Sequence, residues 1–196
     1  MLSSSLTAED KTQLLGLARR TLEAAFDGDS QAPLEDFRTR ERELSRALTA
    51  PSGCFVSLFG PRRRLRGCIG RLESRKKLYE NVAHLAVQAA FHDPRFQPVS
   101  REELAGLTLH VSVLGPTVPL PSLDQLEIGR HGLVVSNGAI RGVLLAEVAT
   151  ERGWTRETFL RETCHKAGLD PGGCDGYEIG YFEELHFAEE RNPRHK

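Results

Sequence analysis

The dipeptide Asn137-Gly138 most limits what this chain can fold into. The segments on either side of it, 133–136 and 139–145, are rich in apolar residues. Asn-Gly between two apolar runs is the strongest short-range signal for a β-hairpin, because both residues accept the positive φ angles of a type I′ turn. The chain is therefore expected to contain an antiparallel sheet.

Other segments predict further strands and the helices between them. Gly60 and Pro61 separate two apolar runs, 54–59 and 64–69, which predicts a second hairpin. Apolar and polar residues alternate over 107–114, as in a half-buried strand. Helical spacing of apolar residues predicts three main helices. They are expected over 8–26 with Thr7 as cap, over 75–91 with Ser74 as cap, and from Thr155 to near Gly168. A short helix is expected over 41–48, an irregular loop over 30–40, and a closing strand over 177–187.

Hairpins that alternate with helices indicate the α+β class, with a mostly antiparallel sheet and flanking helices. The length of 196 residues suits a single domain with a real core. We expect that core over about 8–189, and a disordered tail over 190–196.

The hexapeptide Leu-Arg-Gly-Cys-Ile-Gly at 65–70 is the strongest candidate site. In a strand, Arg66 and Cys68 point the same way, and a nearby guanidinium favours the nucleophilic thiolate. Gly67 leaves room for a ligand or for another backbone. The alternative is that Cys68 is a small packed residue, since free cysteine is among the most buried residue types.

Further polar residues could complete such a site. Asp93 and Arg95 flank Pro94, and they could form a structural turn or present a guanidinium to an anionic substrate. A thiol nucleophile needs a base, and six histidines are candidates. They are His84, His92, His110, His131, His165 and His186. His131 is favoured because it lies between glycines before a strand.

Several motifs in order resemble the AMMECR1 family, in its bacterial and archaeal branch of AmmeMemoRadiSam system protein A. The resemblance covers most of the chain. The motifs lie at 55–58, 65–70, 89–96, 111–114, 129–133, 153–154, 159–160 and 163–169.

The resemblance implies an α+β fold with a larger and a smaller lobe and a cleft lined by the cysteine motif. It also implies association with a Memo-like protein and a radical SAM protein. The chain departs from the family at Ala146-Glu147, where the family usually has Pro-Gln. Glu147 therefore adds a negative charge at this point.

These observations favour a cysteine-dependent enzyme acting on a small anionic or carbonyl substrate. Cys68 would be nucleophile or acid/base, His131 its base, and Glu147 the group that orients the histidine. Substrate would be held by Arg66, Gly67, Asp93, Arg95 and Lys166. Neither a metal nor a cofactor is expected.

Two other functions stay open from the sequence. The first is a non-catalytic module that binds a Memo-like protein, with Cys68 as a packing residue. The second is RNA binding through Arg62, Arg63 and Arg64, although a run of charges in a turn is usually a solvated surface. The net charge of −1 disfavours a globally basic nucleic-acid-binding protein.

The chain is expected to work in the cytoplasm. No stretch approaches the roughly 20 apolar residues of a membrane-spanning helix. The first residues lack the basic and apolar regions of a signal peptide. The four cysteines, Cys54, Cys68, Cys164 and Cys174, have no Cys-x-x-Cys spacing, so zinc ribbons and thioredoxin-type sites have no support. With no export signal, reduced thiols are expected, and disulfide pairing of the even number of cysteines is the alternative.

Overall fold

A computed structural model of the chain describes residues 6–138, 140–169 and 176–190. The described residues form two compact units. The larger holds 6–113 with 186–190, and the smaller holds the described part of 114–185. Helices combine with antiparallel strand pairs, so the α+β prediction is confirmed. The predicted tail lies outside the described residues from 191 onward.

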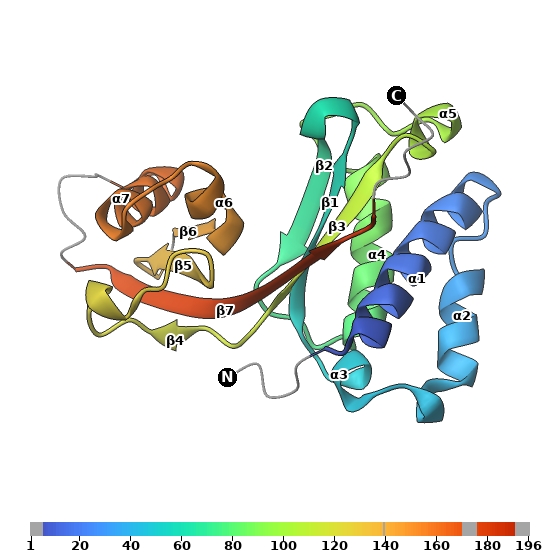
Figure 1. The fold of residues 1–196 in the computed structure, drawn as a ribbon, viewed down its shortest axis with the longest axis horizontal. Helices are drawn as coiled ribbons and strands as arrows, with labels where there is room; N and C mark the ends of the chain where they lie inside the picture. The colour runs from blue at the N-terminus through green and yellow to red at the C-terminus, as the bar shows by residue number, and fades with distance from the viewer. Residues whose placement is uncertain (1–5, 139, 170–175, 191–196) are drawn as a thin grey trace. The chain divides into compact units, whose positions relative to one another are not determined.

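The larger unit carries a layer of helices on a sheet (Figure 1). Its strands follow the order β2-β1-β3, with residues 186–188 of β7 next to β3. The strands are β1 (Gly53–Phe59), β2 (Leu65–Arg71), β3 (Thr108–Leu114) and the end of β7 (Glu178–Ala188). The α-helices are α1 (Ala8–Phe26), α2 (Ala32–Thr39), α3 (Arg46–Thr49), α4 (Leu78–Phe91) and α5 (Arg101–Leu104). Two 3₁₀ turns, Glu41–Glu43 and Pro61–Arg63, lie between them.

Local sequence explains where α1 begins. The Thr7 hydroxyl accepts the Asp10 N–H at 3.1 Å, and the Asp10 carboxylate accepts the Thr7 N–H at 2.9 Å. This reciprocal capping satisfies two backbone donors that a helix start would leave unpaired. The predicted helix over 8–26 and its Thr7 cap are confirmed.

The helices pack on one face of the sheet, and Gly67 allows the close approach. A Cβ added to Gly67 would lie 2.1 Å from the Ala89 carbonyl oxygen of α4. From β1, the fully buried Cys54, Val56 and Leu58 supply the apolar side of this contact. Side chains alternate along a strand, so residues next to these point to the opposite face of the sheet.

Three expectations about helices in the larger unit are wrong. Residues 30–40 contain α2, because Pro33 suits a first helical turn and Leu34 and Phe37 are buried one turn apart. Residues 41–48 form a 3₁₀ turn and the short α3 instead of one helix. Ser74 does not cap α4, since its hydroxyl accepts the Lys76 N–H in a turn before the helix.

The smaller unit packs two helices against its own strands. Its elements are β4 (Val118–Pro119), β5 (His131–Ser136), β6 (Arg141–Leu144), α6 (Ala146–Glu151), α7 (Arg156–Lys166) and most of β7. β5 pairs with both β6 and β7, and β4 pairs with β7. The hairpin predicted around Asn137-Gly138 is confirmed, but its predicted type I′ turn is wrong. φ is 86° at Gly138, whereas Asn137 is not among the described residues with positive φ, and β6 begins only at Arg141. The closing strand over 177–187 is confirmed as β7.

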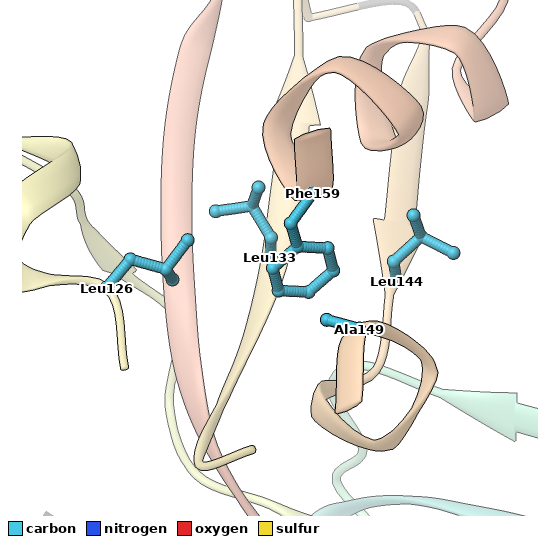
Figure 2. Packing of buried hydrophobic residues seen from close by; sticks show 5 residues of the cluster. All are labelled: Leu126, Leu133, Leu144, Ala149 and Phe159. Carbon is cyan, nitrogen blue, oxygen red and sulfur yellow. The ribbon is translucent and has the colours of Figure 1, made fainter. Parts of the chain in front are cut away.

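A compact apolar cluster holds the smaller unit together (Figure 2). The Phe159 ring from α7 lies among Leu133 and Leu144 of the hairpin and Ala149 of α6, all of them buried. Burial of one such aromatic side chain contributes roughly 1.5–3 kcal/mol. Neither α6 nor its contact with the hairpin was expected from the sequence.

No helix in the described part of the chain has the length and apolar character to cross a membrane.

Replacing Gly67 with alanine should lower the free energy of unfolding by about 3 kcal/mol, because the new methyl group meets a helix backbone that cannot move aside. The matched control is Gly16→Ala inside α1, where the nearest atom to a new Cβ is the Arg20 guanidinium at 3.9 Å. That change should raise stability by about 0.5–1 kcal/mol. Chemical denaturation measures both, and equal effects would contradict the close α4–β2 contact.

Candidate functional site

Cys68 lies on the face of the sheet that is turned away from the helices. It pairs with Ser57 of β1 across the hairpin. Gly67, its neighbour, faces the α4 backbone, so Cys68 faces the other way. The residue is partly exposed and takes no part in a disulfide. It is therefore less enclosed than Cys54 and Cys164, which are fully buried.

The Asp93 carboxylate fixes the segment after α4 against this strand. One oxygen accepts the Cys68 backbone N–H at 2.9 Å. The Arg95 N–H and Nε donate to the other oxygen at 3.1 and 2.9 Å, and Arg95 Nη2 donates to the first at 2.7 Å. The Asp93 side chain is 1% exposed. These donors, with the Arg95 side chain first, hold the pKa of Asp93 at about 2.

The Arg95 guanidinium links Asp93 to Cys68. Besides its bonds to Asp93, its Nη2 donates to the Cys68 carbonyl oxygen at 3.0 Å. The pKa of Arg95 is raised mainly by its hydrogen bonds to the Asp93 carboxylate, with a smaller contribution from Cys68. We call these three residues the Asp93–Arg95–Cys68 cluster. It unites two predicted site residues with the predicted nucleophile.

Arg66 is held elsewhere. Its Nε and Nη2 form a two-pronged ion pair with Glu103 at 2.9 and 3.0 Å, and its Nη1 donates to the Gln97 carbonyl at 2.7 Å. The pairing register shifts by one residue at Arg66, which is a β-bulge that interrupts the alternation expected for this strand. Thus Arg95, not Arg66, is the cation that contacts Cys68. The space beside Gly67 is taken by the α4 backbone.

A chain of polar side chains on the same sheet face was not expected. Ser112 Oγ lies 3.2 Å from His186 Nδ1, and His186 Nε2 lies 3.2 Å from His110 Nδ1. The His110 ring also contacts Phe59, with centroids 4.5 Å apart. Phe59 lies two residues after Ser57, the partner of Cys68, so these side chains share a face. Burial first, then His186 and Arg63, lowers the pKa of His110 to about 4.

The sequence carried only a partial signal for this chain. Thr108, His110 and Ser112 form the polar side of an alternating strand, which places His110 and Ser112 on one face. His186 comes from the end of β7, 76 residues further along the chain, and its place beside them depends on the tertiary fold.

His131, the base favoured by the sequence, begins β5 in the smaller unit. Its Nδ1 accepts the Glu127 N–H at 3.1 Å, so in this arrangement the neutral ring carries its proton on Nε2. The ring is 5% exposed and packs on Tyr181, with centroids 4.6 Å apart. Burial is the main cause that lowers the pKa of His131. A role as base would require His131 to give up its bond to Glu127.

Glu147 and Lys166 also belong to the smaller unit. Glu147 lies in the first turn of α6, where a carboxylate interacts favourably with the helix dipole. Lys166 is exposed in the last turn of α7, where a cation is favoured for the same reason. Within this unit, His131 and Tyr181 line a hollow of about 260 Å³, together with the ion-paired Arg130 and Glu183.

The other cysteines differ from Cys68. Cys54 and Cys164 are fully buried, and burial strongly raises the pKa of Cys54. Cys174 lies outside the described residues. Within the described ranges, no group of three or more His, Cys, Asp or Glu side chains is arranged to hold a metal ion.

Comparison with known proteins agrees with this α+β architecture. A crystal structure of uncharacterised protein PH0010 from Pyrococcus horikoshii superposes with a TM-score of 0.73 at 34% identity, covering 90% of each chain. The two chains therefore share the fold.

The AMMECR1 sequence profile matches residues 15–187, and the chain belongs to this family. A protein from Thermofilum pendens is 38% identical, over 94% of this chain and 92% of its own length. Protein MJ0810 from Methanocaldococcus jannaschii is 41% identical, over 72% of this chain and 75% of its own length. The resemblance to the AMMECR1 family that the motifs predicted is confirmed.

Replacing Asp93 with asparagine should lower the free energy of unfolding at pH 7 by about 2 kcal/mol. The folded-state pKa is depressed to about 2, so the stabilisation is complete above about pH 4 and fades as the pH falls toward 2. Denaturation experiments across pH should show the difference in unfolding free energy between wild type and variant shrinking as the pH falls from about 4 toward 2.

The matched control is Asp27→Asn. Asp27 pairs with Arg101 at 2.6 Å, but their side chains are 69% and 56% exposed, and such pairs contribute at most about 1 kcal/mol. If both variants lost the same stability, the Asp93 carboxylate would not have the structural role described here.

Proposed function

We propose that this AMMECR1-family protein is a cysteine-dependent enzyme that acts on a small anionic or carbonyl substrate, with Cys68 as nucleophile. The observation that carries this proposal is the Arg95 guanidinium, which is held by buried Asp93 and donates to the backbone carbonyl of Cys68. A fixed cation beside a partly exposed thiol favours the thiolate, the nucleophilic form. The Arg95 side chain is 56% exposed, so it can also meet an anionic group of a substrate.

The chemistry that follows is addition to an electrophilic carbon. The Cys68 sulfur donates an electron pair to a carbonyl carbon, and the π electrons of the C=O bond move to its oxygen. Arg95 stabilises the negative charge that develops. A proton must then reach the oxygen, and the His110–His186 pair lies on the same sheet face as Cys68. We propose that this is the proton that the Cys68 thiol gives up, carried by His186, while His110, which its lowered pKa keeps neutral, positions His186. The predicted base His131 and its predicted partner Glu147 remain part of the proposal.

The proposals about partners rest on the family resemblance. That resemblance implies association with a Memo-like protein and a radical SAM protein, and we propose that this protein works beside both. A reactive thiol needs a reducing compartment, which supports the proposal of a cytoplasmic location. A module that only binds a Memo-like protein is the alternative, and RNA binding through 62–64 is a weaker one.

Alkylation across pH tests the thiol directly. In a Cys174→Ser background, native Cys68 should react with iodoacetamide along a curve with its midpoint below the ordinary value of about 8.5. Arg95→Gln should move that midpoint upward by about one pH unit. Arg101→Gln, which removes an exposed ion pair, should leave it unchanged. Buried Cys54 and Cys164 should stay unlabelled until the protein unfolds.

A second comparison tests anion recognition. The ratio of the alkylation rate with negatively charged iodoacetate to the rate with neutral iodoacetamide should be higher for the wild type than for Arg95→Gln. If Cys68 stays inert in the folded protein, or if Arg95→Gln does not move the midpoint, the enzyme proposal is contradicted. The module that only binds a Memo-like protein would then be favoured.

A further inference from the structure

An aromatic side chain from β1 shares the sheet face of Cys68. Phe55 pairs with Gly70 across the β1–β2 hairpin, and the Ser57–Cys68 pair follows two residues along each strand. The pairing register is regular over these residues, because its shift comes only after Leu58. Residues two apart in a strand point to the same face, so Phe55 lies on the face of Cys68.

Gly70 shows where the Phe55 ring lies. A Cβ added to Gly70 would be 2.1 Å from both Cγ and Cδ1 of that ring. The ring therefore fills the space that a side chain at position 70 would take. Strand residues rise about 3.3 Å each, so this space is about 6.6 Å from Cys68 along β2. Phe55 is partly exposed, so the ring offers an apolar surface close to the sulfur.

The Arg95 guanidinium approaches Cys68 from the other side. Among the described strands, β2 ends the sheet and has β1 alone as its neighbour. The Cys68 N–H and C=O bond to Asp93 and Arg95, so they point to the free edge, away from β1. Cys68 is therefore flanked by a cation at the sheet edge and by the Phe55 ring, which comes from β1.

We propose, resting on the proposed function, that Phe55 determines which substrates Cys68 accepts. The preferred substrate carries an anionic group for Arg95 on one side of its electrophilic carbon and a flat apolar group for Phe55 on the other. An aromatic α-keto acid is the simplest compound of this class. The reaction is the addition described above: the S–C bond forms, the π bond of the C=O group opens, and the thiol proton ends on the oxygen.

The Phe55 ring also has a structural role, since an aromatic side chain that covers a strand glycine stabilises the sheet. Loss of stability in Phe55→Ala would follow from that role alone. A test of substrate selection must therefore compare two reagents that differ only in a ring, at the same thiol of the same variant.

The test compares the alkylation rates of Cys68 with N-phenylmaleimide and N-ethylmaleimide in the Cys174→Ser background. Divided by the same ratio for free glutathione, the wild-type ratio should be about two- to tenfold, the effect of one aromatic contact. Phe55→Ala should bring it to about one, and Phe55→Leu should lower it too if the alanine variant does not fold. Phe55→Tyr should keep it. Phe26→Ala, the control, removes a partly exposed ring of α1 and should leave it unchanged.

Protection by two keto acids tests the whole substrate class. Phenylpyruvate should protect Cys68 from iodoacetamide at a lower concentration than pyruvate, which lacks the phenyl ring. Phe55→Ala should remove that difference, whereas Arg95→Gln should weaken protection by both acids, because each has a carboxylate.

The outcomes separate this inference from the proposed function. If Cys68 reacts with neither maleimide in the folded protein, the proposed function fails and the role of Phe55 fails with it. If Cys68 reacts but the wild-type ratio equals that of glutathione, or Phe55→Ala keeps the wild-type ratio, only the role of Phe55 is overturned.

Discussion

The candidate site depends on one buried carboxylate. An ionised Asp93 with a 1% exposed side chain is stable only because donors surround it: the Cys68 backbone N–H and three N–H groups of Arg95. Those donors join the segment after α4 to β2, and they hold the Arg95 guanidinium at Cys68. Gly67 contributes by its missing side chain, which lets the α4 backbone come close enough for Asp93 to reach the strand.

The same arrangement separates Cys68 from the other described cysteines. Cys54 and Cys164 are fully buried, and for Cys54 this burial favours the uncharged thiol. Cys68 faces away from the helical core and meets a cation.

Local patterns in the sequence predicted the hairpins, α1 with its Thr7 cap, and the identity of Asp93, Arg95 and Cys68 as polar residues of interest. These patterns failed where a contact between distant parts of the chain sets the position of a side chain. Alternation along a strand placed Arg66 beside Cys68, but a β-bulge and the Glu103 carboxylate take its guanidinium away. The partnership of His110 with His186 joins residues 76 positions apart, and no local pattern encodes it. Only Leu34 and Phe37 are buried in α2, so its periodic signal is weak.

The central claim is that Arg95, held by Asp93, keeps Cys68 ready to ionise. The most direct measurement is an NMR titration of the Cys68 Cβ carbon in the unmodified wild-type chain, which follows the thiol itself without any reagent. The account predicts a single ionisation step clearly below the ordinary value of about 8.5. A step at or above that value would contradict it, because the guanidinium would then not act on the sulfur.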